Sequence, residues 1–295
     1  MGTSYKYNKN EVRWLERCLI ISGWITVLLM AMFSSFSQNR MTFGVGENTK
    51  DSNYLCGFML YAFCYYFKKL IETKKIKYLV PPILFFVMQL RTGSRGALLA
   101  FIVVAIASTM VSDTEKKNKR NTIFGILILS LLFWVVWRVV LPRINPLIGE
   151  RYTILYLQQY GTVGRTNIWA YLIDKYIHSN PLRQLIGYGY GTTHTVNEMG
   201  GVSAHHVAHN LYIDNLISIG ILGALTQIFF QISCIRSARK TDHTLAICVF
   251  LGYIAMCMSL SMTSYKPLWA LVIMILIYEQ WIGYSNSDRK EKEVV

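Results

Sequence analysis

Charged side chains are scarce in this sequence. Asp, Glu, Lys and Arg make up only 16% of its 295 residues, whereas 53% are hydrophobic and the mean hydropathy is +0.32. Soluble domains typically carry about 25% charged residues. The shortage excludes an ordinary soluble domain and predicts a polytopic membrane protein.

Features of nucleic-acid-binding proteins are also missing. The formal net charge is +14, but the lysines and arginines fall in short runs between apolar segments, as residues that orient a membrane protein do. No nucleic-acid reader motif is present. We therefore expect no nucleic-acid partner.

The cysteines lack the spacing of a metal site or a disulfide framework. All six lie inside apolar segments, none lies between residues 142 and 209, and no CxxC or Cys/His zinc pattern occurs. We predict that they are small hydrophobic residues packed in the core or against lipid.

Eight apolar segments predict an all-α polytopic integral membrane protein with a single membrane domain over residues 1–295. Helices are expected because lipid offers the backbone no hydrogen-bond partner, and the alternating pattern of a barrel is absent. The first segment begins near Cys18 and is long enough to span, so we expect no cleavable signal peptide. The expected spans are residues 18–36, 54–67, 78–90, 96–111, 122–141, 210–235, 244–264 and 267–284.

The basic residues predict the orientation. With a cytoplasmic N-terminus, the inside segments hold 19 of the 30 Lys and Arg residues, and every short inside loop is richer in them than every short outside loop. Both termini are then cytoplasmic, and residues 142–209 form one long extracytoplasmic loop. Arg91 and Arg95, in the turn between the third and fourth spans, are expected on the same outer face.

Two arginines at expected helix starts are candidates for binding a diphosphate. Arg95 opens the fourth span, and Arg165 opens a helix in the long loop. At a helix start the backbone N–H groups and the dipole favour an anion, and a guanidinium adds bidentate contacts. The alternative is that these arginines contact lipid headgroups.

The loop helix itself is expected within GRTNIWAYLIDKYIHSNP, lying at the membrane interface. Thr166 or Asn167 can cap it, and Ile168 and Leu172 recur at helical spacing. Trp169 suits the headgroup level. This segment therefore predicts a short interfacial helix.

The GYGYG run at residues 187–191 follows this helix. Its GxGxG spacing and the absence of a preceding strand argue against a nucleotide fingerprint. We interpret its glycines as residues that allow tight turns or a close backbone approach.

His209 stands at the entry of the sixth span. An imidazole can take a proton from a hydroxyl near neutral pH; the alternative is a hydrogen bond to a neighbouring carbonyl. His205 and His209 have the i,i+4 spacing of metal ligands, but a zinc site needs a third ligand. The nearby residues that could supply one are His194, Glu198 and His206. His209 is therefore either a general base or a residue bonded to a neighbouring carbonyl, and we expect no metal or other cofactor.

Four segments together resemble the O-antigen ligase/polymerase family, integral-membrane glycosyltransferases that act on lipid-linked glycans. The segments are RTGSRGALLAF (91–101), GRTNIWAYL (164–172), NPLRQLIGYGYG (180–191) and HNLYIDNLISIGILGAL (209–225). They occur in the family's order, and the resemblance covers more than half of the chain.

The resemblance implies an inverting, metal-independent transfer of a saccharide from undecaprenyl diphosphate to an acceptor hydroxyl, by a polymerase or a ligase in the bacterial inner membrane. Arg95 and Arg165 would bind the diphosphate at the outer face, and His209 would deprotonate the acceptor. Implied partners are the lipid-linked glycan, a glycan or lipid acceptor, membrane lipids and other polysaccharide assembly proteins. Supporting positions are expected for Arg91, Asn210, His206 and Trp169.

The chain departs from the family at two points. Family members commonly carry more spans before the SRG helix, so part of the lipid groove is expected to be missing. They often have a histidine where this chain has Val207. Two other functions stay open: a transporter, although the spans lack an ionisable residue at mid-depth, and a non-catalytic membrane partner in polysaccharide assembly.

Overall fold

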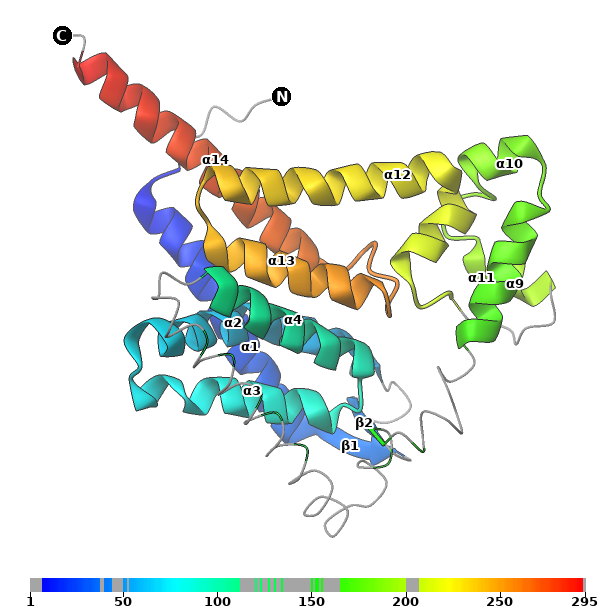
Figure 1. Ribbon diagram of the computed structural model, residues 1–295, viewed down its shortest axis with the longest axis horizontal. Helices are drawn as coiled ribbons and strands as arrows, with labels where there is room; N and C mark the ends of the chain where they lie inside the picture. The colour runs from blue at the N-terminus through cyan, green and yellow to red at the C-terminus, as the bar shows by residue number, and fades with distance from the viewer. Residues whose placement is uncertain are drawn as a thin grey trace.

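The computed structural model describes residues 7–37, 40–43, 50–51, 53–111, 165–199 and 207–293, with isolated positions between 120 and 155. This part of the chain is helical apart from one small sheet (Figure 1). The elements are α1 (Lys9–Phe33), β1 (Ser34–Ser37), β2 (Arg40–Phe43), β3 (Lys50–Asp51), α2 (Asn53–Thr73), the 3-10 helix η1 (Ile76–Tyr78), α3 (Val80–Arg91), α4 (Arg95–Val111), α9 (Arg165–Ile177), α10 (Pro181–Ile186), α11 (Thr193–Met199), α12 (Leu211–Lys240), α13 (Thr244–Cys257) and α14 (Lys266–Glu293).

The sheet is a feature that the all-α prediction missed. Its three strands are antiparallel in the order β1-β2-β3, and Ser37 pairs with Arg40. Strands of four residues or fewer carry too little alternation to be recognised from sequence. The sheet connects α1 to α2 at the end of the helix bundle where the outer face is expected.

The helix ends differ from the expected spans because hydropathy does not detect polar caps. Asn8 starts α1 ahead of the apolar run: its Oδ1 accepts the N–H groups of Asn10 at 2.9 Å and Glu11 at 3.0 Å, and its own N–H donates to Glu11 at 2.8 Å. This reciprocal pair is a capping box. At the other extreme, α13 ends at Cys257, well before the expected end at residue 264.

Two described helices are long and apolar enough to cross a membrane, Asn10–Phe33 and Leu211–Lys240. The helices Arg95–Val111 and Thr244–Cys257 are apolar but shorter. The expected span at 122–141 lies outside the described residues apart from isolated positions. The number of eight spans therefore stays a prediction.

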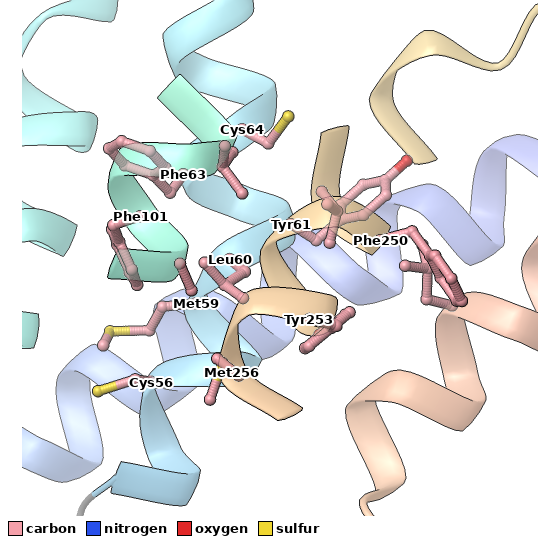
Figure 2. Packing of buried hydrophobic residues seen from close by; sticks show 14 of the residues in the cluster. Cys56, Met59, Leu60, Tyr61, Phe63, Cys64, Phe101, Phe250, Tyr253 and Met256 are labelled. Carbon is pink, nitrogen blue, oxygen red and sulfur yellow. The ribbon is translucent and has the colours of Figure 1, made fainter. Parts of the chain in front are cut away.

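The core is built where α2 packs against α4 and α13 (Figure 2). The rings of Phe63 and Phe101 lie 4.7 Å apart, and the buried Tyr253 hydroxyl donates to the Gly57 carbonyl at 2.9 Å. All six cysteines are free and five are buried, so the prediction that they are small hydrophobic residues is confirmed. Only Cys18 is exposed.

The connections between helices gather at two ends of this bundle. At one end, His243 between α12 and α13 lies against Glu16 near the start of α1, with 3.3 Å between Nε2 and Oε1. At the other, the Tyr54 hydroxyl at the start of α2 donates to the Ser261 carbonyl between α13 and α14 at 3.3 Å. The first end gathers segments expected in the cytoplasm, and the second gathers segments expected outside.

Candidate active site

Arg95 is held at the start of α4 by a buried polar turn. Ser94 caps the helix, since its Oγ accepts the Ala97 N–H at 3.2 Å. The Ser94 N–H donates to Thr92 Oγ1 at 3.2 Å, and Gln89 Nε2 donates to the Ser94 carbonyl at 2.9 Å. Arg95 itself is partly exposed. The prediction that this arginine opens a helix is confirmed.

The long loop reaches this turn. Tyr152 belongs to the loop, and its hydroxyl donates to the Leu90 carbonyl, one residue before Arg91, at 3.1 Å. Two regions far apart in the sequence are thus in contact at the same end of the bundle.

Arg165 starts α9, as predicted, and is also partly exposed. Ile168 and Leu172 point from this helix into a small cluster with Ala208 and Ile217. The cluster fixes α9 against the first turns of α12. Thr166 and Asn167 lie in the first turn of the helix, so the prediction that either residue caps it is wrong: the helix already begins at Arg165.

His209 occupies the last turn before α12 and has a positive φ of 50°. The left-handed region is unfavourable for a residue with a Cβ atom and tends to be retained at functional sites. Asn210 follows as the N-cap of α12, its Oδ1 accepting the N–H groups of Tyr212 at 3.0 Å and Ile213 at 3.2 Å. Trp169 reaches the same turn from α9, donating its indole N–H to the Ala208 carbonyl at 2.6 Å.

The helix starts that carry Arg95, Arg165 and His209 all contact a segment that the sequence-based prediction did not include. This segment, residues 258–265, is called the α13–α14 turn below. The Arg165 guanidinium donates to the Ser259 carbonyl at 3.1 Å, and Asn210 Nδ2 donates to the Met258 carbonyl at 3.2 Å.

The start of α4 packs against the same turn. A Cβ atom on Gly96 would lie 1.7 Å from Ser259 Oγ, so only glycine permits this approach. The three helix starts that carry the predicted residues therefore share one contact surface. The sequence signal for this turn was the run of hydroxyl residues in SLSMTS (259–264), which the prediction placed at the end of the seventh span.

The GYGYG run docks onto a break in α12. Gly220 has a φ of 67° and interrupts the helix, which frees carbonyl groups one turn earlier. The N–H groups of Tyr188 and Gly189 donate to the carbonyls of Ile217 at 2.8 Å and Ser218 at 2.9 Å. The interpretation of these glycines as loop geometry is confirmed.

The other two predicted supporting residues are Arg91 and His206. Arg91 ends α3, and its guanidinium lies 3.8 Å from Met88 Sδ on the same helix. His206 and its neighbour His205 lie outside the described residues.

Chemically, the arrangement combines two cationic groups, two helix N-termini and an imidazole around one turn. Helix N-termini and guanidinium groups bind phosphate oxygens well. An imidazole can accept a proton from a hydroxyl. The site therefore suits a reaction in which a phosphate group leaves and a hydroxyl attacks.

A solved structure on the structural coordination of polymerization and crosslinking by a peptidoglycan synthase complex contains a chain with a similar fold. The TM-score is 0.50 at 14% sequence identity, and the match covers 93% of this chain and 84% of that chain. At this identity the likeness concerns the fold alone. No curated protein sequence matches the chain.

The sequence model of the O-antigen ligase family matches residues 82–228. This stretch includes Arg95, Arg165 and His209, together with the GYGYG run and the break in α12. It ends before the α13–α14 turn. By this match, the chain carries an O-antigen ligase family domain over residues 82–228.

Proposed function

We propose that this protein is a membrane glycosyltransferase that moves a saccharide from undecaprenyl diphosphate to an acceptor hydroxyl, in the synthesis of a cell-surface polysaccharide. Members of the O-antigen ligase family are bacterial membrane proteins with glycosyltransferase-like activity. The observation that carries the proposal is the convergence of the Arg95, Arg165 and His209 segments on the α13–α14 turn.

In the proposed reaction, Arg95 and Arg165 hold the diphosphate of the donor. His209 takes the proton of the acceptor hydroxyl as its oxygen attacks the anomeric carbon. The new C–O bond forms as the bond from the anomeric carbon to the phosphate oxygen breaks, and the electron pair leaves on the diphosphate. Attack opposite the leaving group inverts the anomeric configuration.

The arginines favour the transition state because negative charge grows on the leaving oxygen. Donors that are already in place need no reorganisation when this charge appears, so their contribution to catalysis is large. The helix starts of α4 and α9 act in the same sense.

The reaction is proposed to occur at the extracytoplasmic face. The support is the distribution of Lys and Arg along the chain, together with the grouping of the expected inside and outside segments at opposite ends of the bundle. The outer leaflet presents the lipid-linked donor beside the site.

The decisive experiment is a deletion strain whose glycans are analysed, with complementation by the wild-type and His209→Ala chains. Single repeat units on the final carrier would identify a polymerase. Full-length polymer stranded on the lipid carrier would identify a ligase. Unchanged glycans would overturn the proposed function in both forms. Full complementation by a His209→Ala protein that accumulates normally in the membrane would overturn the role of His209 as the base.

A further inference from the structure

The strained conformation of His209 is maintained by contacts to both of its neighbours. On one side, the Ala208 carbonyl accepts the Trp169 indole N–H at 2.6 Å. On the other, the Asn210 side chain caps α12 and also donates to the Met258 carbonyl at 3.2 Å. A positive φ at a non-glycine residue persists only where the surroundings determine it in this way.

A buried carboxylate makes a further contact to the residue before His209. Asp214, in the first turn of α12, is only 8% exposed. Its Oδ1 accepts the Ala208 N–H at 3.1 Å. The Ala208 residue is therefore held at its N–H by Asp214 and at its carbonyl by Trp169, which fixes the direction in which the chain enters His209.

The same carboxylate is tied to the α13–α14 turn. Its Oδ2 accepts the Ser261 hydroxyl. Ser261 is in turn anchored by its carbonyl, which accepts the Tyr54 hydroxyl at 3.3 Å. Asp214 thus joins the His209 turn to the segment that also receives Arg165.

The carboxylate is well suited to this task. Buried carboxyl groups are costly unless they are hydrogen-bonded, and an ionised carboxylate accepts several donors at once. Because it satisfies donors from two separate segments, removing it leaves a buried backbone N–H and a hydroxyl without their acceptor.

We propose that Asp214 is a positioning residue for His209, acting through the Ala208 N–H and the Ser261 hydroxyl. The inference rests on the proposed function, and it adds the α13–α14 turn, which lies outside the stretch matched by the family, to the machinery of the site. Asp214 orients the base and does not bind the donor, so its loss changes the rate of transfer rather than the use of the diphosphate.

The test uses the purified full chain in lipid nanodiscs with an undecaprenyl-diphosphate-linked saccharide as donor. We expect Asp214→Ala to lower kcat about 10- to 100-fold while the KM for the donor changes less than about twofold. Asp214→Asn keeps an oxygen for the Ala208 N–H and should recover most of the lost rate. Ser261→Ala should lower kcat by a smaller factor.

A double variant tests the connection between the two residues. If Ser261 acts through Asp214, the variant carrying Asp214→Ala and Ser261→Ala is no slower than Asp214→Ala alone. Asp174→Ala is the matched control, because this carboxylate lies on the surface of α9, is 70% exposed, and pairs with His178 at 3.2 Å. Its kinetics should equal those of the wild type.

Hydrogen exchange supplies a readout that is independent of activity. We expect Asp214→Ala to speed exchange in the peptide containing Ala208 while α13 exchanges as in the wild type. Faster exchange with unchanged kcat would overturn the positioning role and leave the proposed function standing. A loss of rate that comes only from a higher KM for the donor, with kcat unchanged, would also overturn the positioning role. A wild-type protein without transfer activity would overturn both proposals.

Discussion

Gly187 packs directly against the backbone of Ser218, where the long loop crosses α12. A Cβ atom on Gly187 would lie 2.4 Å from the Ser218 carbonyl carbon and oxygen, and one on Gly220 would lie 2.4 Å from the Leu185 carbonyl oxygen. Both residues also have a positive φ, of 80° and 67°. This reciprocal contact lets backbone N–H groups of the loop satisfy carbonyls exposed by the break, as membrane proteins require.

Alanine at either glycine should therefore disrupt the loop. We expect Gly187→Ala and Gly220→Ala to lower the free energy of unfolding by ~1–3 kcal/mol each, because the clashing atoms are backbone and cannot move aside cheaply. Gly191→Ala is the matched control: its φ is 77°, but no atom lies within 4 Å of the added Cβ. Thermal unfolding in detergent measures the difference in stability. Equal losses of stability at all three positions would show that the positive φ, and not the backbone clash, causes the destabilisation.

Substituting His209 by glycine should separate stability from activity. Glycine adopts a positive φ without strain, so we expect His209→Gly to unfold at the same temperature as the wild type or higher, although transfer is lost. His209→Val, with a branched Cβ at the same φ, should unfold at a lower temperature. A His209→Gly protein that retains transfer would contradict the role of this residue as the base.

The arginines should differ in their effects. Arg95→Ala and Arg165→Ala are each expected to reduce transfer on the order of tenfold to a hundredfold, the effect of losing a charged hydrogen bond worth about 1.5–3 kcal/mol in the transition state. Arg91→Ala should have a smaller effect, since its guanidinium lies against Met88 on its own helix. Initial rates across a range of donor concentrations test this ranking, and equal losses in all three variants would indicate general surface charge instead.

The contact between α4 and the α13–α14 turn can be probed by a compensating pair. Gly96→Ala places its Cβ atom 1.7 Å from Ser259 Oγ and 2.5 Å from Ser259 Cβ, so we expect it to reduce both stability and transfer. Ser259→Gly removes both clashing atoms. The double variant should therefore be closer to the wild type than Gly96→Ala is, and a double variant with purely additive losses would contradict the contact.

Cysteine labelling on intact cells tests the orientation. In a Cys18→Ser background, whose remaining cysteines are buried, a membrane-impermeant maleimide should label Asp174→Cys on α9. Lys75→Cys, between α2 and α3, should react only after permeabilisation. Both positions are exposed in the structure, so the membrane alone should distinguish them, and the opposite pattern would place the site on the cytoplasmic side.

The sequence by itself determined the helical class, the start of α4 at Arg95 and of α9 at Arg165, and the buried state of most cysteines. These features depend on local composition, on periodicity and on the distribution of charge, which are all readable along one chain. The same local signals failed for the three short strands and for the polar start of α1 at Asn8.

Only the tertiary structure decided how the site is assembled. The contacts of Arg165, Asn210 and Asp214 with the α13–α14 turn join residues 47 to 94 positions apart. The positive φ of His209 and the backbone contacts of Gly187 and Gly220 depend on the same packing of separate segments. The backbone carbonyls of Met258 and Ser259 accept two of these hydrogen bonds. Every residue has a backbone carbonyl, so the sequence does not show which carbonyls act as acceptors. The packing of separate helices, rather than any one motif, brings these groups together.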